Sequence, residues 1–233
     1  MLLPRFQYYI LRLWGDDMTI NTEDILNSIL ESISRIDYVK ADEIPNIDLY
    51  MDQVTTFMND HMKSSKRYED DKILTKTMIN NYAKNELLPP PLKKKYSKEH
   101  VMVLIFIYYF KNILSIKDIE TLLKPITENY FHTDKELSFT DLYEEVCSLE
   151  KSRIDHLKED ITEIYRTSSE TFSDADEENR EFLRLFSFIC TLSFDVYVKK
   201  QLIEKLVDAL PPSDNRKHKK WFFSLHYKNA AFP

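Results

Sequence analysis

Two neighbouring stretches of this sequence carry side chains that could bind nucleic acid. On a helix predicted from Thr75 to about Leu87, an advance of about 100° per residue places one set of polar side chains on a single arc. The members of this arc are Lys76, Thr77, Asn80, Asn81 and Lys84. Asparagine can bind the edge of adenine through two hydrogen bonds, lysine favours guanine, and the methyl group of threonine can contact that of thymine. The arc holds no acidic residue, so it suits base edges in a DNA groove.

The second stretch follows directly and is strongly basic. Pro89 to Pro91 end the helix, because proline lacks an amide hydrogen and disfavours a helical conformation in the residue before it. The extended segment after them carries Lys93, Lys94, Lys95 and Tyr96 outward. Lysines on a protruding segment can contact phosphates, and the counterions they release supply affinity that is independent of base sequence. A recognition helix followed by such a wing predicts a winged helix-turn-helix.

Positive charge is concentrated around these two stretches. The whole chain has a net charge of −7. Residues 72–111, in contrast, hold 8 basic and 2 acidic residues, a net charge of +6. A basic island in an acidic body is typical of a protein with a polyanionic partner. The alternative is an ordinary solvated surface, because polar outer faces are the default for amphipathic helices.

The elements that hold these side chains are predicted to be helical throughout, so we expect an all-α fold. Gly15 is the only glycine in the chain. Sandwiches, barrels and doubly wound sheets need glycine at many turns, and phosphate-binding loops need it for close approach. The 43% hydrophobic and 30% charged residues are typical of a folded globular protein.

Helices are also predicted on the C-terminal side of the basic island. Ser97 is expected to cap a helix over 98–112 whose apolar content indicates burial nearly all round. Ser115 begins a short helix with a capping-box-like pattern, which we expect to end near Lys124 because Pro125 follows.

A second helical module is predicted over 138–210, with helices at 138–166 and 176–210. It could hold two copies of the chain together or form the helical bundle of a monomer, and the sequence leaves both open. Its apolar residues cover too much of the second helix for one narrow seam, so we expect them to be core, either within one bundle or shared between two subunits. These residues are Phe182, Leu185, Phe186, Phe188, Ile189 and Leu192. The basic, aromatic tail at 211–233 could bind phosphates or a membrane surface, but we expect it to pack back on the bundle.

The stretch INNYAKNELLPPPLKKKYSKEH at 79–100 is unusual, and residues 49–126 around it resemble the bacterial family known as domain of unknown function 1836. More distantly, the region is similar to the winged helix-turn-helix of MerR-type regulators, with Thr75 in the recognition helix and Tyr96 closing the wing. It departs from that pattern in having no glycine in the wing and a longer connection at 63–72. The resemblance implies a DNA-binding regulator that dimerises through a long C-terminal helix.

The sequence predicts neither an enzyme nor a cofactor, because no nucleophile and base occur at a recognisable spacing. His156 shares one predicted helix with Glu159, Asp160 and Glu163, a spacing compatible with a metal. A solvated charged face explains the same residues, and we expect no metal site.

Reduced thiols and apolar segments of limited length indicate a cytoplasmic protein. Cys147 and Cys190 stand without a CxxC pair. The apolar stretch 101–110 is too short to span a membrane, and 182–198 contains charges. We expect residues 1–17 to be a non-native leader, with translation starting at the methionine that follows.

These patterns lead to one prediction and one alternative. The prediction is a dimeric transcriptional regulator with a DNA-binding domain at 18–126, whose partner is double-stranded DNA and whose small-molecule effector is unknown. Its predicted DNA contacts are Thr75, Lys76, Thr77, Asn80, Asn81, Lys84, Lys93, Lys94, Lys95 and Tyr96. The alternative is a helical protein-interaction module that has lost DNA binding, in which the basic island meets an acidic partner.

Overall fold

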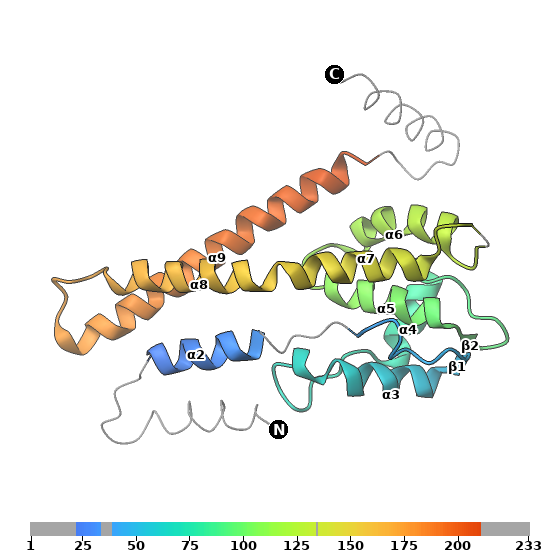
Figure 1. The fold of residues 1–233 in the computed structure, drawn as a ribbon, viewed down its shortest axis with the longest axis horizontal. Coiled ribbons are helices and arrows are strands. Elements are labelled where there is room, and N and C mark those ends of the chain that lie inside the picture. The colour runs from blue at the N-terminus through green and yellow to red at the C-terminus, as the bar shows by residue number, and fades with distance from the viewer. Residues whose placement is uncertain (1–21, 34–38, 134, 211–233) are drawn as a thin grey trace.

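The computed structural model describes residues 22–33, 39–133 and 135–210 (Figure 1). The predicted leader at 1–17 and the tail at 211–233 lie outside these residues. In chain order the described elements are α2 (Thr22–Ile33), β1 (Leu49–Tyr50), α3 (Met51–His61), the 3₁₀ turn η1 (Lys63–Ser65), α4 (Lys76–Lys84), β2 (Lys95–Tyr96), α5 (Lys98–Phe110), α6 (Ile116–Tyr130), α7 (Phe139–Ser152), α8 (Ile154–Ser169) and α9 (Glu177–Asp208). Helices dominate and the described sheet has two short strands, so the predicted all-α fold is confirmed.

Helix α5 is the centre of the core. Ser97 caps its N-terminus by accepting a hydrogen bond from the backbone N of His100 at 3.5 Å. Every residue from Val101 to Ile105 is fully buried, because α5 contacts other elements on all its sides. The predicted cap and the predicted burial are both confirmed. Nearly complete burial of one helix fixes the elements around it, including the strand β2 that leads into it.

Helix α6 begins as predicted and ends later than predicted. Ser115 and Asp118 form the capping box, with the Ser115 hydroxyl donating to the carboxylate at 2.7 Å. The helix nevertheless continues through Pro125 to Tyr130, so the predicted end near Lys124 is wrong. Proline removes one backbone hydrogen bond, but apolar residues on both sides of it pack against the core and hold the helix together.

The core continues into α7, across the gap between the two predicted modules. Ser138 caps α7 and shares a capping box with Asp141. The side chains of Phe139 and Tyr143 are then buried in the same core as α3, α4 and α5. The Tyr143 hydroxyl donates to the carbonyl of Val39 at 2.6 Å. One core therefore joins the N-terminal part of the chain to α7.

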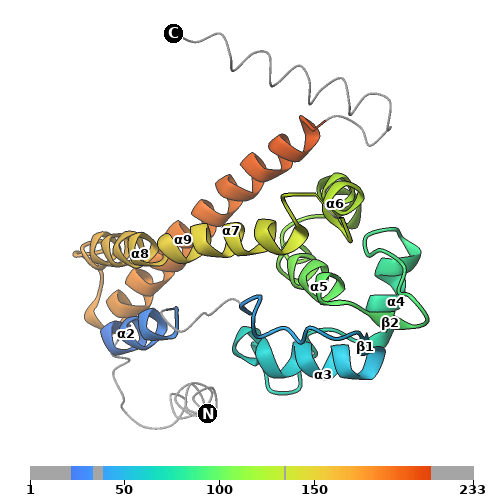
Figure 2. The ribbon, with the colours of Figure 1, turned by 45° about the vertical axis from the view of Figure 1, so that its right-hand side comes forward.

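Helix α9 packs on α8 along one side only, and its two ends have different neighbours (Figure 2). In its first half, the buried Phe188 meets Tyr165 of α8 edge to face, with ring centroids 5.4 Å apart. Near its C-terminus, Val207 is buried in the main core, and α9 contacts α6. Phe182, Phe186 and Ile189, which were predicted to be core, are all more than half exposed in the single chain. Their burial against a second subunit stays a prediction. No described element covers that side of the helix.

Among the residues that the structure describes, no helix combines the length and the apolar character needed to cross a membrane.

Candidate nucleic-acid interface

Helix α4 is short and has a clear inner and outer side. The Thr75 hydroxyl accepts a hydrogen bond from the backbone N of Met78 at 3.2 Å, which confirms the predicted cap. Ile79 and Tyr82 are buried and fix the inner side of the helix. Burial raises the pKa of the Tyr82 phenol. The helix ends at Lys84, three residues before the predicted end.

The predicted polar arc forms the outer side of α4. All five of its side chains, Lys76, Thr77, Asn80, Asn81 and Lys84, are exposed. Lys76 differs from the other four because its ammonium forms an ion pair with the carboxylate of Asp52 on α3. The pairing neutralises one positive charge at the start of α4. Thr75 is only half exposed and its hydroxyl already serves as the cap, so it contributes less to this surface than predicted.

The segment after α4 turns back into the core. Glu86 has a φ of 59°, the left-handed conformation common just after a helix end. The backbone N atoms of Leu87 and Leu88 donate to the carbonyl of Tyr82 at 3.0 and 3.3 Å, and both leucine side chains are buried. The Glu86 carboxylate also accepts a hydrogen bond from the Lys124 ammonium on α6 at 3.0 Å. These contacts fix where the next segment leaves the core.

The predicted wing is a very small hairpin. The backbone N of Lys95 donates to the carbonyl of Leu92 at 2.9 Å, and the two residues form an antiparallel bridge. Lys93 and Lys94 between them have φ values of 51° and 64°. Two successive positive φ values closed by such a hydrogen bond are typical of a type I′ turn. Both lysines are exposed, and Leu92 beside them is 71% exposed.

The hairpin is attached to the start of α3 through the sheet. Strand β2 pairs antiparallel with β1, with Leu49 opposite Tyr96 and Tyr50 opposite Lys95. The Lys95 ammonium lies 5.2 Å from the centre of the Tyr50 ring, at cation–π distance. Figures 1 and 2 both place α4, β1 and β2 at one end of the molecule, away from α8. The polar side of α4 and the lysine turn therefore belong to the same end.

Tyr96 was predicted to contact DNA, and the structure corrects this. Its side chain is 3% exposed and packs in the core, and burial raises the pKa of its phenol. Alternation along the strand explains the result: Lys95 and Tyr96 are successive residues and point to opposite faces of the hairpin. Tyr96 anchors the base of the wing.

A histidine cluster lies beneath the wing. The Ser97 hydroxyl lies 2.7 Å from Nδ1 of the buried His100 and 2.9 Å from Nε2 of His132. Burial lowers the pKa of His100 to about 4, and His132 adds to the shift, while the carbonyls of Pro90 and Pro89 oppose it. Nε2 of His100 is buried and makes no hydrogen bond of good geometry with any described residue. His100 is therefore a neutral packing residue at neutral pH.

Two exposed residues of this surface were missed by the sequence predictions as possible contacts. Leu92 stands at the edge of the lysine turn, and Tyr50, 54% exposed, stands beside Lys95. The sequence did contain a signal for Leu92, because it is an apolar residue between the prolines and the lysines of the predicted wing. No sequence signal placed Tyr50 beside the wing, because that contact depends on strand pairing between distant segments.

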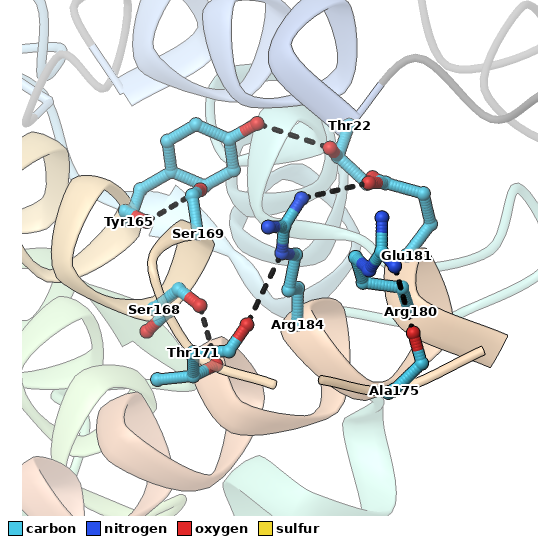
Figure 3. A network of polar contacts seen from close by, with 9 residues as sticks. All are labelled: Thr22, Tyr165, Ser168, Ser169, Thr171, Ala175, Arg180, Glu181 and Arg184. Atoms are coloured by element: carbon cyan, nitrogen blue, oxygen red, sulfur yellow. Dashed lines mark hydrogen bonds and ion pairs between the residues drawn. The ribbon is translucent and has the colours of Figure 1, made fainter. Parts of the chain in front are cut away.

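A second polar site lies between α2, α8 and α9 (Figure 3). Its cavity has a volume of about 270 Å³. Tyr165 bridges to α2 through a 3.0 Å hydrogen bond between its hydroxyl and that of Thr22. The Arg184 guanidinium bonds to the Glu181 carboxylate at 3.2 Å and donates to the carbonyl of Thr171 at 3.2 Å. Residues of all three helices line the cavity, and the bond between Tyr165 and Thr22 links α8 to α2.

His156, the histidine with a metal-compatible spacing in the sequence, lies on an exposed part of α8. His156 pairs with Glu159, its Nδ1 lying 3.5 Å from a carboxylate oxygen, and both side chains are strongly exposed. The described part of the chain holds no group of three or more histidine, cysteine or carboxylate side chains that could bind a metal.

Comparison with known families gives one match. Residues 39–146 match the family model described as a domain of unknown function, DUF1836. The match includes the polar side of α4, the wing and the buried residues of α7. No curated protein and no solved structure matches the chain.

Proposed function

We propose that the domain of unknown function at residues 39–146 binds double-stranded DNA, with α4 as the recognition helix and the hairpin at 92–95 as a wing. The observation that carries the proposal is the pair of lysines in left-handed conformation at the hairpin tip. A two-residue turn of this type favours asparagine and glycine. Lysine there costs stability, and strained residues of this kind cluster at functional sites.

The dimensions of α4 suit the major groove. Its nine residues give a length of about 14 Å at a rise of about 1.5 Å per residue. The major groove is about 12 Å wide and presents a different donor and acceptor pattern for each base pair. Asn80 and Asn81 are the side chains able to make two hydrogen bonds to one base, and both are exposed in the middle of the helix.

The wing supplies the part of the affinity that does not depend on sequence. Lys93 and Lys94 are both exposed at the tip of the turn. Lysines on a protruding turn can reach phosphates, and each neutralised phosphate releases counterions. Sequence-specific binding of this kind regulates transcription by occupying or bending promoter DNA. The distant similarity to MerR-type regulators supports the same function.

Fluorescence anisotropy on labelled duplexes tests the proposal. The protein is titrated with DNA from its own upstream region and with an unrelated duplex, over a series of salt concentrations. Replacing Lys93 and Lys94 with alanine should weaken binding to both duplexes and lower the slope of log affinity against log salt by about 1.8, at about 0.9 per phosphate. The control replaces two exposed lysines elsewhere, Lys117 and Lys151, with alanine. It should change neither the affinity for the two duplexes nor the salt slope.

Substitution of the two asparagines tests sequence preference, whereas substitution of the lysines tests affinity for any sequence. Replacing Asn80 and Asn81 with alanine should reduce the preference for one duplex over the other, at about 1–3 kcal/mol for each lost bidentate pair, and leave the salt dependence unchanged. If neither duplex binds at low salt, the DNA-binding proposal fails. The alternative, an interaction module whose basic island meets an acidic protein, would then be tested by pull-down.

A further inference from the structure

The C-terminal half of helix α9 carries an apolar stripe that no described element covers. Each member of the stripe follows the previous one by four residues, and at about 100° per residue all of them fall within an arc of about 120°. The members are Phe194, Val198, Leu202 and Leu206, which are 66%, 46%, 58% and 61% exposed. Asp195 and Lys205 share this arc, and the Asp195 carboxylate is paired with the Lys199 ammonium at 2.7 Å. The stripe is an accessible apolar face with few charges.

The packing of the other side of α9 holds the stripe in a fixed position. Ile203 and Val207 pack in the main core, and this end of α9 contacts α6. These two residues lie about 140° from the middle of the stripe around the helix axis, so the stripe faces away from the core. Figures 1 and 2 both show the C-terminal half of α9 diverging from α8. The stripe is therefore a preformed surface.

The size of the stripe favours an occupant from the same chain. The accessible area of its four side chains is on the order of 400 Å². Two copies of the stripe facing each other would bury about 800 Å² in total, which is below the ~1,200 Å² at which specific interfaces between proteins begin. A tethered segment can bind through a smaller area, because the tether gives it an effective concentration in the millimolar range. The residues that directly follow α9 meet this condition.

The chain continues beyond Leu210 with a turn signal and a segment suited to a helix. Pro211 and Pro212 stand just after the end of α9, where proline prevents a helix from continuing. Residues 213–229 then contain neither proline nor glycine, the two residues that most oppose a helix. The sequence therefore predicts a second helix after a turn.

This predicted helix has one apolar face. At about 100° per residue, Trp221, Phe222 and Leu225 fall within an arc of about 100°. Lys220 and Phe223 lie about 150° from the middle of that arc. Three large apolar side chains on one side of a helix need a surface to pack on.

We propose that residues 213–229 fold back as a helix and pack antiparallel on the stripe of α9. Both helices advance about 1.5 Å per residue, so residues equally distant from the two prolines lie at the same height. Trp221 then comes beside Leu202, and Leu225 comes beside Val198. The expectation that the tail packs back on the bundle thereby acquires a defined face of α9 and a register.

Fluorescence of Trp221 tests the proposal in the full chain without DNA, so its outcome does not depend on DNA binding. Trp14→Phe leaves Trp221 as the sole tryptophan. Docking buries the indole, so its emission should be blue-shifted, and acrylamide should quench it several-fold less than in the urea-unfolded chain. Leu202→Asp should move both readouts towards their unfolded values. The matched control is Val196→Asp, which changes a side chain that is 66% exposed outside the stripe and should leave both readouts unchanged.

Two adjacent phenylalanines of the tail give a second matched pair. Phe222→Glu places a charge on the face that docks, so it should expose Trp221 to acrylamide as strongly as Leu202→Asp does. Phe223→Glu changes the same residue type on the opposite side of the helix and should leave Trp221 shielded. Equal effects of the two variants would overturn the proposed face.

Disulfide trapping tests the register and distinguishes the chain's own tail from that of a second copy. In a background without Cys147 and Cys190, Leu202→Cys is combined with Trp221→Cys, since a disulfide needs Cβ atoms about 4 Å apart. The bridge should form within one chain at a rate independent of protein concentration. Val196→Cys combined with Trp221→Cys should form little of it.

Three results would overturn the proposal. Quenching of Trp221 in the folded chain as strong as in urea would show that the tail does not dock. A shielded Trp221 that is insensitive to Leu202→Asp would place the tail on another surface. Bridges that form only between chains, at a rate that rises with concentration, would make the tail of a second copy the occupant of the stripe.

Discussion

The lysine turn of the wing allows a test in which stability and DNA affinity change in opposite directions. The perturbation is the double substitution Lys93→Asn with Lys94→Gly, which installs the residues that a type I′ turn prefers. The two native φ values, 51° and 64°, are then occupied by residues that tolerate them. The hairpin hydrogen bond between Lys95 and Leu92 involves backbone atoms and is retained.

The expected gain in the free energy of unfolding follows from the backbone. A left-handed conformation costs an ordinary L-residue roughly 1–2 kcal/mol. Glycine avoids this cost but gains freedom in the unfolded chain, which offsets about 0.5–1 kcal/mol of the benefit. Asparagine reduces the cost by bonding locally. The double variant should therefore be about 1–2 kcal/mol more stable, and it should bind DNA less tightly.

Urea unfolding followed by circular dichroism measures the first effect, and anisotropy on DNA measures the second. The control is Lys117→Gly in the exposed part of α6, which should lose about 1 kcal/mol because its backbone is helical. An unchanged or lower stability of the double variant would refute the strained-turn explanation. A stabilised variant with unchanged DNA affinity would refute the role of the wing.

Three other predictions follow from single contacts. The unfolded chain protonates His100 below about pH 6.5, whereas the folded chain does so only near pH 4. The free energy of unfolding should therefore fall as the pH drops through this window, by at most about 3 kcal/mol, and His100→Phe should remove most of that dependence in urea titrations. Asp52→Asn frees the Lys76 ammonium and should tighten DNA binding at low salt while changing stability by less than about 1 kcal/mol; weaker binding would contradict this. Tyr143→Phe leaves the buried carbonyl of Val39 unpaired and should cost about 1–3 kcal/mol, whereas thermal melting unchanged from wild type would show that the bond contributes nothing.

Local signals predicted the helix starts and the outward side of α4. Ser97, Ser115 and Ser138 precede helices because a serine hydroxyl satisfies a free amide of the first turn, and this depends on residues only three positions apart. The exposed arc of α4 followed from helical periodicity alone. Features that depend on a few neighbouring residues can be predicted from such signals.

The features that were missed depend on tertiary contacts. Pro125 lies inside α6 because packing on both sides outweighs one lost hydrogen bond. Tyr96 faces inward because β2 pairs with a strand from a distant part of the chain. Lys76 is paired with Asp52 because α3 and α4 lie together in the fold. Neither the left-handed φ of the wing lysines nor their turn type could be predicted, since the sequence lacks the residues that signal such a turn.

The shared core has a consequence for how this chain unfolds. Val39, Phe139 and Val207 belong to one buried cluster although they come from widely separated parts of the sequence. The family match ends at residue 146, so a fragment limited to it would lack the α9 residues that close the cluster. Residues that are buried in one core unfold together, whatever their separation in the sequence. The wing and the end of α9 should therefore melt in a single transition, so the surface proposed for DNA is lost when the contacts at the far end of the chain are lost.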